Sequence, residues 1–441
     1  MRLSLLLLAL VGSVLAKPLS VPVSRAASSD AHTNGMRLVR NGESNSCVKR
    51  TRPNTVVLDG SYMLSAAKDV AQGGYGTELT NILTLADYWM TQGPWTVTSK
   101  KVDVPGGTKK DYASQAPYWW PANWNDPSSS QTCPYVQRDG LRNPDVDLYT
   151  DRRDGGSMMN STYMLSLAWW YTGDYKYREH AGKVLRTWFI DEATRMTPNL
   201  QHAQIIPCAN TGRFIGIIDF SQQYTDVIDA VALLNTGYDE AWCEADAASF
   251  EDWNRQFLTW LTDSPFGKAE LGYQNNHGAF AAMQIAALAS WLGDDATASR
   301  YLQDQKAHLD ATISANGSQP LEIQRTTSFH YSTFALVAYL RMVAIGQKEG
   351  VDVDLWGYEG PEGQSIPAAV RYILPAAASG AQAWPHPEIN FKRFGAYDIV
   401  QFAADMGMKE AKDILDQIEE PFHGGTWALS PAVQQLDSTL F

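Results

Sequence analysis

The sequence predicts an all-α fold, an incomplete (α/α) toroid built of αα-hairpins. Apolar stretches with helical spacing end at glycine and are followed by more polar helical stretches, which is the pattern of an αα-hairpin. These units recur at intervals of roughly 50–65 residues, as in repeat architectures. Strand patterns are few and are limited to WTVTSK and IIDF. An open solenoid and a plain helical bundle are the alternative arrangements.

The beginning of the chain predicts export. MRLSLLLLALVGSVLA is typical of a secretory signal peptide over residues 1–16, and its apolar run is too short to span a membrane. Residues 17–50 are polar without periodicity and are expected to form a propeptide or a flexible N-terminal arm. Residues 51–441 are expected to form a single domain, secreted and without a membrane partner. The triplets that begin at Asn160 and Asn316 match the N-glycosylation pattern, which suits an exported eukaryotic protein.

The predicted hairpins follow one another along the chain. NSTYMLSLAWWYTGD ends at Gly173 and is followed by DYKYREHAGKVLRTWF, and VIDAVALLNTG ends at Gly237 before an amphipathic stretch that leads to FLTWL. AFAAMQIAALASWLGD ends at Gly293 before ATASRYLQDQKAHL, and YSTFALVAYLRMVAIG ends at Gly346 before IPAAVRYILPAAAS. Because glycine readily adopts the left-handed conformation of a helix C-terminus, we expect a helix to end at each of these residues. The first, more apolar helix of each hairpin is expected to lie inside and to line a cleft.

Composition limits the classes of partner. The formal net charge of −13 and the pI of about 5.1 argue against general nucleic-acid binding. A cleft can still carry local positive charge and bind an anionic substrate. The 15 Trp and 20 Tyr residues include rings suited to stack on sugars, although many can equally fill the core. The sequence carries no clear oligomerisation signal, so a monomer is favoured and the oligomeric state stays open.

The cysteines are interpreted in the light of export. Cys47, Cys133, Cys208 and Cys243 are even in number, so up to two disulfides are expected, and three pairings are open. No CxxC or HxxxH pair occurs, so no zinc site is expected. No other metal or cofactor is expected either.

Two polar clusters stand at the starts of inner-type helices, within NNHGAF and within QPLEIQRTTSFHYSTFAL. Equivalent ends of neighbouring hairpins lie close together in a toroid, so we expect the two clusters to converge. Helix capping and packing are the structural alternatives for these side chains. The side chains that the clusters offer are Asn275, Asn276, His277, Glu322, Arg325, His330 and Tyr331.

These residue types suit β-elimination on a uronic acid. The C5 proton becomes acidic only when the neighbouring carboxylate is neutralised, and amide and guanidinium groups can hydrogen-bond that carboxylate and stabilise the enolate-like dianion. A base then removes the proton and an acid protonates the leaving O4. His and Tyr suit these roles, the Tyr with a pKa lowered by the nearby cation.

Three other functions compete with this interpretation. Glycoside hydrolysis needs two carboxylates, and Glu322 and Asp139 lie near the motifs without an obvious partner. A non-catalytic glycan-binding protein would need the aromatic side chains but not the Asn-His-Arg-Tyr set. A metal-dependent lyase is the third alternative, and insensitivity to a chelator would argue against it.

The motifs also resemble those of a known family. NNHGAF and RTTSFHY are similar to the catalytic signature of the alginate lyase domain family of polysaccharide lyases. Similar segments follow in that family's usual order between about residue 60 and about residue 400, namely GPWTVTSK, DYASQAPYWWP, PYVQRDGLRNPD, TPNLQHAQ, GRFIGIIDF and WPHPEINF. The chain therefore resembles a secreted fungal member of this family. The resemblance implies an incomplete (α/α) toroid, in agreement with the hairpin pattern, and an anionic uronate polysaccharide as the substrate.

The resemblance also implies roles for individual residues. Asn276 resembles the amide that neutralises the substrate carboxylate, with Arg325 beside it. His277 resembles the catalytic histidine, and Tyr331 resembles the tyrosine that donates to O4. In mannuronate and glucuronate the C5 proton and O4 lie on the same side, so Tyr331 is expected to serve as both base and acid in a syn elimination. In guluronate they are anti, and His277 would be the natural base.

The preferred polymer is left between two candidates. Mannuronate-rich alginate comes first, because the resemblance points there, and glucuronan is the alternative, because the two uronates share their configuration at C4 and C5. Gly278 and Ala279 stand where bacterial alginate lyases tend to carry bulkier residues. A small pocket change of this kind can shift preference by roughly 1–3 kcal/mol. Endo or exo action stays open.

Other segments predict substrate-binding residues. Aromatic rings of PYWWP are expected to stack on sugars, and Arg138 to meet a neighbouring carboxylate. Cys133 and Cys208 flank two of these loops, so a disulfide between them would fix the wall of the cleft. The predicted set is Asn275, Tyr118, Trp119, Trp120, Arg138, His202, Gln204 and His330. Weaker candidates, which can equally serve structural roles, are Arg213, Arg393, Trp384 and His386.

Overall fold

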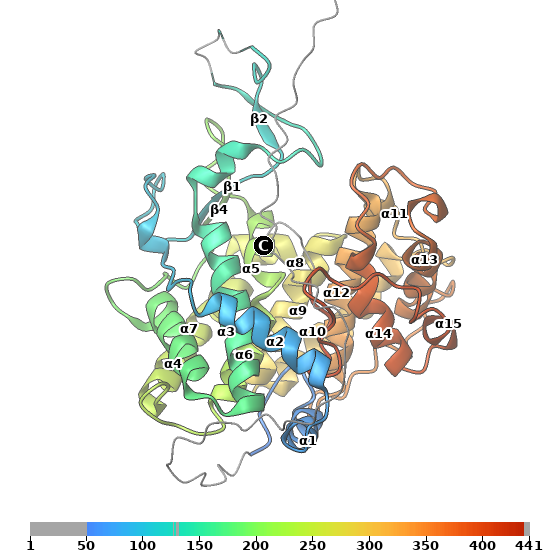
Figure 1. Ribbon diagram of the computed structural model, residues 1–441. Coiled ribbons are helices and arrows are strands. Elements are labelled where there is room, and N and C mark those ends of the chain that lie inside the picture. The colour runs from blue at the N-terminus through green and yellow to red at the C-terminus, as the bar shows by residue number, and fades with distance from the viewer. Residues whose placement is uncertain (1–50, 127, 129–131, 436–441) are drawn as a thin grey trace, which may run out of the picture. The chain divides into compact units, whose positions relative to one another are not determined.

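The structure is a computed structural model that describes residues 51–126, 128 and 132–435. The expected signal peptide, the expected N-terminal arm and Cys47 lie outside the described residues. Arg50–Phe441 forms one compact unit, and its described part is mainly helical (Figure 1). No helix in the described part is long and apolar enough to cross a membrane.

The elements are as follows. The α-helices are α1 (Gly60–Ala71), α2 (Gly76–Trp89), α3 (Asp151–Thr172), α4 (Tyr175–Leu185), α5 (Ile218–Ser221), α6 (Tyr224–Leu234), α7 (Glu244–Asp263), α8 (Pro265–Leu271), α9 (Asn276–Trp291), α10 (Asp295–Thr312), α11 (Pro320–Ile323), α12 (Ser328–Gly346), α13 (Ile366–Ser379), α14 (Tyr397–Asp405) and α15 (Lys409–Lys412). The strands are β1 (Ala113–Gln115), β2 (Trp119–Pro121), β3 (Tyr135–Gln137) and β4 (His202–Ile205). Shorter helical turns are η1 (Val97–Ser99), η2 (Pro144–Leu148), η3 (Arg186–Ile190), η4 (Phe214–Ile217), η5 (Ala381–Ala383) and η6 (Arg393–Ala396).

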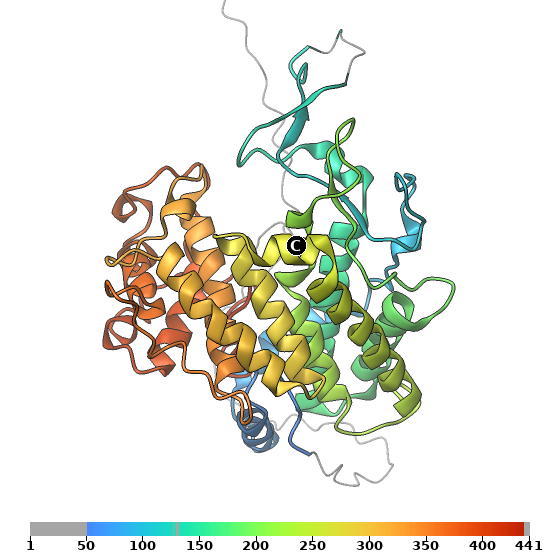
Figure 2. The ribbon, with the colours of Figure 1, turned by 180° about the vertical axis from the view of Figure 1, so that it is seen from behind.

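The most apolar helices lie inside, as predicted. Every residue of α6 is buried, and α9 and α12 are buried along nearly their whole length, which is stable only for a helix surrounded by others. Contacts run in sequence from α3 to α6, from α6 to α9, from α9 to α12 and from α12 to α14. The outer helices α4, α10 and α13 pack against α3, α9 and α12 (Figures 1 and 2). This arrangement confirms the incomplete (α/α) toroid.

Three of the four glycines predicted to end helices do so. Gly173 directly follows α3 with φ of 71°, and Gly293, with φ of 84°, lies just beyond α9. Gly346 is the last residue of α12. The prediction is wrong for Gly237, which lies beyond the turn that follows α6. A side chain at Gly346 would collide with the carbonyl oxygen of Val353, so the glycine permits close packing of two segments.

The two segments expected to be strands are helical turns, so this prediction is wrong. In WTVTSK, the Thr96 hydroxyl accepts a hydrogen bond from the Thr98 N–H at 3.1 Å and begins η1. IIDF lies across η4 and α5. Their β-branched residues favour strands only where a neighbouring strand is available, and tertiary packing overrides that propensity here.

The observed strands form two small sheets. β1 pairs in parallel with β4, with Ala113 opposite His202. β2 pairs antiparallel with β3, with Trp119 opposite Gln137. The strands, labelled β1, β2 and β4 in Figure 1, lie beyond one end of the inner helices, and Figure 2 shows the same arrangement from behind. The sheets therefore add side chains at the end of the toroid where α9 and α12 begin.

A disulfide joins the two sheets. Cys133, which precedes β3, is bonded to Cys208, which follows β4, with their Cα atoms 6.1 Å apart. This is the pairing that the positions of the predicted loops suggested. Cys243 has no disulfide partner among the described residues. Cys47 lies outside them, so a second disulfide stays a prediction.

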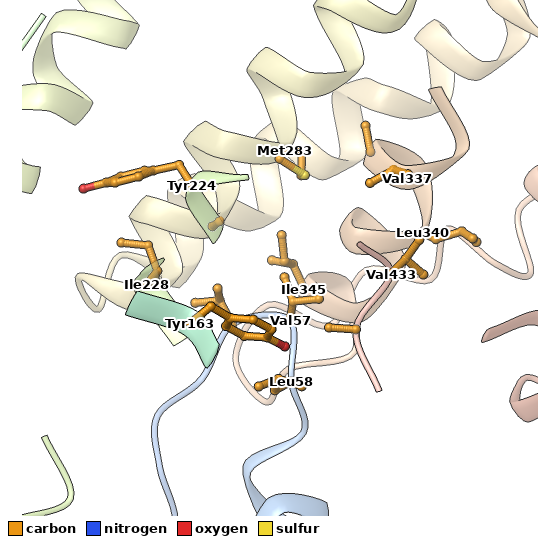
Figure 3. Packing of buried hydrophobic residues seen from close by; sticks show 14 of the residues in the cluster. Val57, Leu58, Tyr163, Tyr224, Ile228, Met283, Val337, Leu340, Ile345 and Val433 are labelled. Atoms are coloured by element: carbon orange, nitrogen blue, oxygen red, sulfur yellow. The ribbon is translucent and has the colours of Figure 1, made fainter. Parts of the chain in front are cut away.

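Both ends of the described chain insert into the hydrophobic core. Val57 and Leu58 from one end and Val433 from the other belong to the same buried cluster (Figure 3). The buried Asp229 of α6 accepts the Leu58 N–H at 2.8 Å and the Val57 N–H at 3.1 Å. The buried Arg341 of α12 donates from Nε to the carbonyl oxygen of Val433 at 2.7 Å. Charged groups of the inner helices thus hold segments that are more than 370 residues apart.

The two glycosylation motifs differ in their accessibility. Asn160 lies inside α3, and its side-chain nitrogen is buried without a hydrogen-bond partner in the described part. Attachment of a glycan there is incompatible with the folded chain. Asn316 is exposed in the turn after α10, where its Oδ1 accepts the Ser318 N–H at 3.0 Å.

Candidate active site

The two predicted polar clusters meet where α9 and α12 begin. The side chain of Asn275 accepts the His277 N–H at 2.9 Å and caps α9. The second cluster lies on α11, in the turn that follows it and on the first turn of α12. Helices α9 and α12 contact each other, and Asn276 and Glu322 form hydrogen bonds between the clusters. The hydrogen bond of the Asn275 side chain thus caps the helix, as the structural alternative for this residue predicted.

Asn276 is fully buried and faces Glu322. Its backbone N–H lies 2.8 Å from Glu322 Oε1, and its Nδ2 lies 2.9 and 2.8 Å from the two carboxylate oxygens. Burial raises the pKa of Glu322, and the hydrogen bonds from Asn276 oppose that shift. The Oδ1 atom of Asn276 is buried and has no hydrogen-bond partner among the described residues. Glu322 therefore fixes the orientation of the Asn276 amide.

His277 is oriented by a second buried carboxylate. Its Nδ1 lies 2.9 Å from Oε1 of Glu270, a residue at the end of α8, and the imidazole is 16% exposed. Burial raises the pKa of Glu270, and the neighbouring His277 opposes that shift. A carboxylate at Nδ1 favours the tautomer with the proton on that nitrogen, so Nε2 becomes the basic nitrogen.

Tyr331 is held by a second tyrosine and by an arginine. Its hydroxyl oxygen lies 2.9 Å from that of Tyr118, and the Arg325 guanidinium carbon lies 3.7 Å from the centre of its ring. Burial raises the pKa of Tyr331 well above its ordinary value, Tyr118 adds to the rise, and Arg325 only partly opposes it. The prediction of a pKa lowered by the cation is therefore wrong in its net direction, because the hydroxyl is almost fully desolvated.

Arg325 is anchored by Asp139 of the loop after β3. Its Nε lies 3.0 Å from Asp139 Oδ2, and Nη2 bonds to Oδ1. Burial raises the pKa of Asp139, but the hydrogen bonds from Arg325 and Thr326 outweigh burial and leave the pKa below its usual value. This ion pair connects the β2–β3 hairpin to the turn before α12. Arg325 still has Nη1 to offer to another anion.

The predicted aromatic residues of β2 take different positions. Tyr118, just before β2, reaches Tyr331 as described, and Trp119 lies beside Arg213, with the guanidinium carbon 5.9 Å from the ring centre. Trp120 donates from Nε1 to the carbonyl oxygen of Leu141 at 2.8 Å. It also packs edge-on against Trp124, and the Arg138 guanidinium carbon lies 3.7 Å from the Trp124 ring centre. Trp120 and Arg138 thus form an outer cluster with Trp124, a 49% exposed residue that the sequence interpretation missed.

His202 and Gln204 form hydrogen bonds to groups outside the set of catalytic candidates, whereas the His330 ring lies 5.1 Å from the Tyr331 ring. Nδ1 of His202 bonds to the carbonyl oxygen of Thr211 at 3.0 Å. Nε2 of Gln204 bonds to Asp219 at 3.0 Å. His330 stacks on Phe334 one turn along α12, with the rings 5.7 Å apart.

Three of the four weaker candidates have structural partners. Trp384 donates to the Ser328 hydroxyl at 2.7 Å, at the start of α12. His386 bonds to the Tyr372 hydroxyl at 2.5 Å. Arg393 pairs with Glu419 at 3.3 Å, whereas the Arg213 guanidinium lies beside the Trp119 ring. The contacts of Trp384 and His386 support α12 and the segment around it.

Sequence interpretation missed an arginine near the two tyrosines. Arg152, in the first turn of α3, lies 3.5 Å from Asp219, which also accepts a hydrogen bond from Ser114. Asp219 raises the pKa of Arg152, and Tyr118 and Tyr331 contribute to the rise. Arg152 is therefore close enough to both tyrosines to influence them electrostatically. Its signal in the sequence, DRRDGG at the start of a helix, does not distinguish it from an ordinary surface arginine.

The two orienting carboxylates carried unequal signals. Glu322 lies within the motif QPLEIQRTTSFHYSTFAL, whereas Glu270 lies in FGKAELGY, which has no distinctive spacing. Among the described residues, no group of three or more His, Cys, Asp and Glu side chains is arranged to hold a metal ion.

Comparison with known proteins identifies the family of the chain. The family model "Alginate lyase" matches residues 96–384. A crystal structure of an alginate lyase from Bacteroides ovatus is 30% identical, with a TM-score of 0.79, over 87% of this chain and 100% of that chain. Alginate lyase A1-III from Sphingomonas species A1 is 15% identical, with a TM-score of 0.53, over 88% of this chain and 99% of that chain, which shows the shared fold alone. No curated protein matches the sequence. The toroid and the matched segment together place the chain in the alginate lyase family, a family of polysaccharide lyases.

Proposed function

We propose that the protein is a secreted enzyme that cleaves 1,4-linked uronate polymers by β-elimination and leaves 4,5-unsaturated uronate ends. Mannuronate-rich alginate is the preferred substrate. The observation that carries the proposal is the pair of tyrosine hydroxyls, 2.9 Å apart, with Arg325 against the ring of Tyr331. His277, held by Glu270, completes the set of acid–base groups. Membership of the alginate lyase family supports the same reaction class.

The substrate carboxylate must be neutralised before the C5 proton can be removed. Arg325 is the donor best placed to do so, because Asp139 occupies only its Nε and Nη2 groups. Its positive charge stabilises the negative charge that develops on the carboxylate as the proton leaves. Asn276 is fully buried and supports this site from within the protein, where its side chain is held by hydrogen bonds to Glu322.

Tyr331 then moves the proton. The C5–H bond breaks as its proton passes to the Tyr331 oxygen, the C4=C5 double bond forms, and the C4–O4 bond breaks as O4 takes a proton from the same hydroxyl. To act as a base, Tyr331 must first release its own proton, and Tyr118 offers a path for it. Arg325, 3.7 Å from the ring centre, stabilises the phenolate. For guluronate, whose C5 proton lies on the opposite side, Nε2 of His277 is the base.

The proposed reaction differs from its rivals in its chemistry. Hydrolysis would need a free pair of carboxylates, but Asp139 is paired with Arg325 and Glu322 is engaged by Asn276. Glucuronan stays the alternative substrate, because glucuronate offers Tyr331 the same C4 and C5 stereochemistry as mannuronate.

The test is ultraviolet absorbance during incubation with polymannuronate, polyguluronate and glucuronan in parallel, with chelator present. Absorbance reports elimination, because only elimination creates the conjugated double bond. We expect it to rise fastest on polymannuronate, the proposed substrate. A faster rise on glucuronan would show that glucuronan, and not alginate, is the preferred substrate. New reducing ends without absorbance would instead establish hydrolysis, and no reaction on any polymer would contradict the proposal.

A further inference from the structure

Adjacent pairs of basic residues occur at five places in the sequence. Processing proteases of the secretory pathway cut after such a pair, because two neighbouring cations match acidic subsites of the protease. They do so only where the chain is accessible and can become extended. The pairs are Lys49-Arg50, Lys100-Lys101, Lys109-Lys110, Arg152-Arg153 and Lys392-Arg393.

The folded chain holds at least one residue of each of the four later pairs. Lys100 is buried, and its ammonium pairs with Asp151 at 2.8 Å. The ammonium of Lys109 bonds to the carbonyl oxygen of Val102 at 2.7 Å. The arginine pair lies in the first turn of α3, and the last pair stands at the start of η6. Segments held in this way do not become extended in a protease without local unfolding.

The first pair stands directly before an accessible stretch. Thr51 and Arg52, which follow Lys49-Arg50, are exposed and belong to no helix or strand. A protease must bind residues on both sides of the bond that it cuts, and these two supply the side after the bond. Close packing begins only at the third residue after the bond, the buried Pro53.

The segment after this pair is anchored by its own contacts. Residues 51–54 line a cavity of about 280 Å³ together with Glu251 of α7. The Leu58 N–H bonds to the buried Asp229 of α6 at 2.8 Å. All of these contacts are made by residues after the pair, so they persist when the residues before Thr51 are removed.

We infer that the protein is made as a precursor and that a secretory processing protease hydrolyses the Arg50–Thr51 peptide bond. One water molecule is consumed, whose oxygen enters the new carboxylate of Arg50 and whose protons go to the new amino group of Thr51. The mature enzyme then begins at Thr51, and residues 17–50, which follow the expected signal peptide, form a propeptide. The inference goes beyond the proposed reaction and rests on the proposed secretion.

The cut also changes the charge of the protein. Residues 17–50 contain six Lys and Arg residues but only two Asp and Glu residues. Their removal makes the mature enzyme more acidic than its precursor. The isoelectric point therefore reports processing independently of the N-terminal sequence.

The first experiment secretes the protein from a eukaryotic host that has a protease specific for basic pairs. N-terminal sequence, mass after reduction of disulfides and isoelectric point are measured. We expect the wild type to begin TRPNTV and to lack all residues of the range 17–50. The double variant with Lys49→Gln and Arg50→Gln should keep residues before Thr51. Arg52→Gln, which removes an exposed arginine but leaves the pair, is the matched control and should be processed like the wild type.

The second experiment does not depend on export by a eukaryotic cell. The full chain is made in the periplasm of a bacterial host, where disulfides form, and is incubated with a purified protease specific for basic pairs. We expect a single cut, after Arg50, and an intact domain from Thr51 onward. A cut at any of the other four pairs, or none after Arg50, would overturn the inference.

The outcomes separate the inference from the proposed function. A secreted wild type that begins at a residue other than Thr51 would overturn the inference and leave the proposed reaction intact. Retention of the protein inside the eukaryotic host would contradict the proposed secretion, and the inference would fail with it. A processed, secreted protein that gives no rise in absorbance on any uronate polymer would contradict the proposed reaction and leave the inference standing.

Discussion

At the scale of single residues, the site consists of groups whose orientation is fixed by carboxylate partners, of which Glu270 and Glu322 are buried and Asp139 is partly exposed. Glu270 holds His277, Glu322 holds Asn276 and Asp139 holds Arg325. Such partners restrict rotation of the side chains and set which nitrogen donates. Tyr331 is the exception, because its partner is another hydroxyl that can exchange a proton with it.

Replacement of Tyr331 by phenylalanine tests the proposed acid–base role. Tyr331→Phe keeps the ring packed against Arg325 but removes the hydroxyl, so turnover should fall by roughly 10²–10⁴-fold. Binding of mannuronate oligosaccharides, measured by calorimetry, should persist, since the carboxylate contacts are untouched. Turnover close to that of the wild type would remove Tyr331 from the mechanism.

His277→Ala distinguishes the two stereochemical routes. If Tyr331 alone serves syn elimination, the variant should lose less activity on polymannuronate than Tyr331→Phe does. It should lose most of its activity on polyguluronate, where Nε2 of His277 is the base. The ratio of initial rates on the two polymers is the measurement. An equal loss on both would show that the imidazole acts in a step common to both substrates.

At the scale of elements, the β2–β3 hairpin brings two residues to the start of α12. Tyr118 contacts Tyr331, and Asp139, in the loop after β3, pairs with Arg325. Short strands of this kind have little core of their own and depend on their attachments. The hairpin is attached by the Asp139–Arg325 ion pair at one point and by the Cys133–Cys208 disulfide at another. The disulfide therefore affects both stability and the position of Tyr118.

Cys133→Ser should lower both the melting temperature and the turnover. The bond closes a loop across a sequence separation of 75 residues, and removal of such a bond typically costs about 2–4 kcal/mol. Calorimetric unfolding and the absorbance assay measure the two effects. Cys243→Ser is the control, because Cys243 takes no part in the Cys133–Cys208 disulfide. Unchanged turnover in Cys133→Ser would mean that the hairpin is positioned without the disulfide.

Glycosylation should follow the elements that carry the two motifs. We expect a glycan on Asn316, in an exposed turn, and none on Asn160, inside α3. Peptide mass spectrometry of protein secreted from a eukaryotic host measures both sites, and Asn316→Gln should abolish the mass increment. A glycan on Asn160 would require that it be attached before α3 packs.

At the scale of the whole molecule, buried carboxylates of the inner helices hold both ends of the described chain. Burial raises the pKa of Asp229 to about 7, although hydrogen bonds from the Leu58, Val56 and Val57 N–H groups oppose the shift. Asp398 of α14 accepts the Gln434 N–H at 2.9 Å near the other end, and burial likewise raises its pKa to about 7. These pKa values exceed those of an unfolded chain, so the folded state binds more protons over the interval between them.

The stability contributed by these groups is therefore complete below about pH 4 and is lost as the pH rises through about 7. Each unit of pKa elevation corresponds to about 1.4 kcal/mol of this loss. Asp229→Asn removes one titrating group, so its melting temperature should fall less between pH 5 and pH 8 than that of the wild type. Differential scanning calorimetry at the two pH values is the measurement. An equal fall in both proteins would exclude Asp229 as a contributor.

The sequence by itself determined the helical toroid and the two motifs at its inner helix starts. Apolar runs such as AFAAMQIAALASW can be stable only inside a protein, and their repetition leaves few arrangements. The tertiary structure alone decided which polar side chains meet. Glu270 and Arg152 carry no local signal, because their partners His277 and Asp219 come from other elements. The tertiary structure also decided the pKa values of the site and which segments form strands. Desolvation of Tyr331 and the pairing of β1 with β4 depend on neighbours that are distant in the chain, which no local pattern specifies.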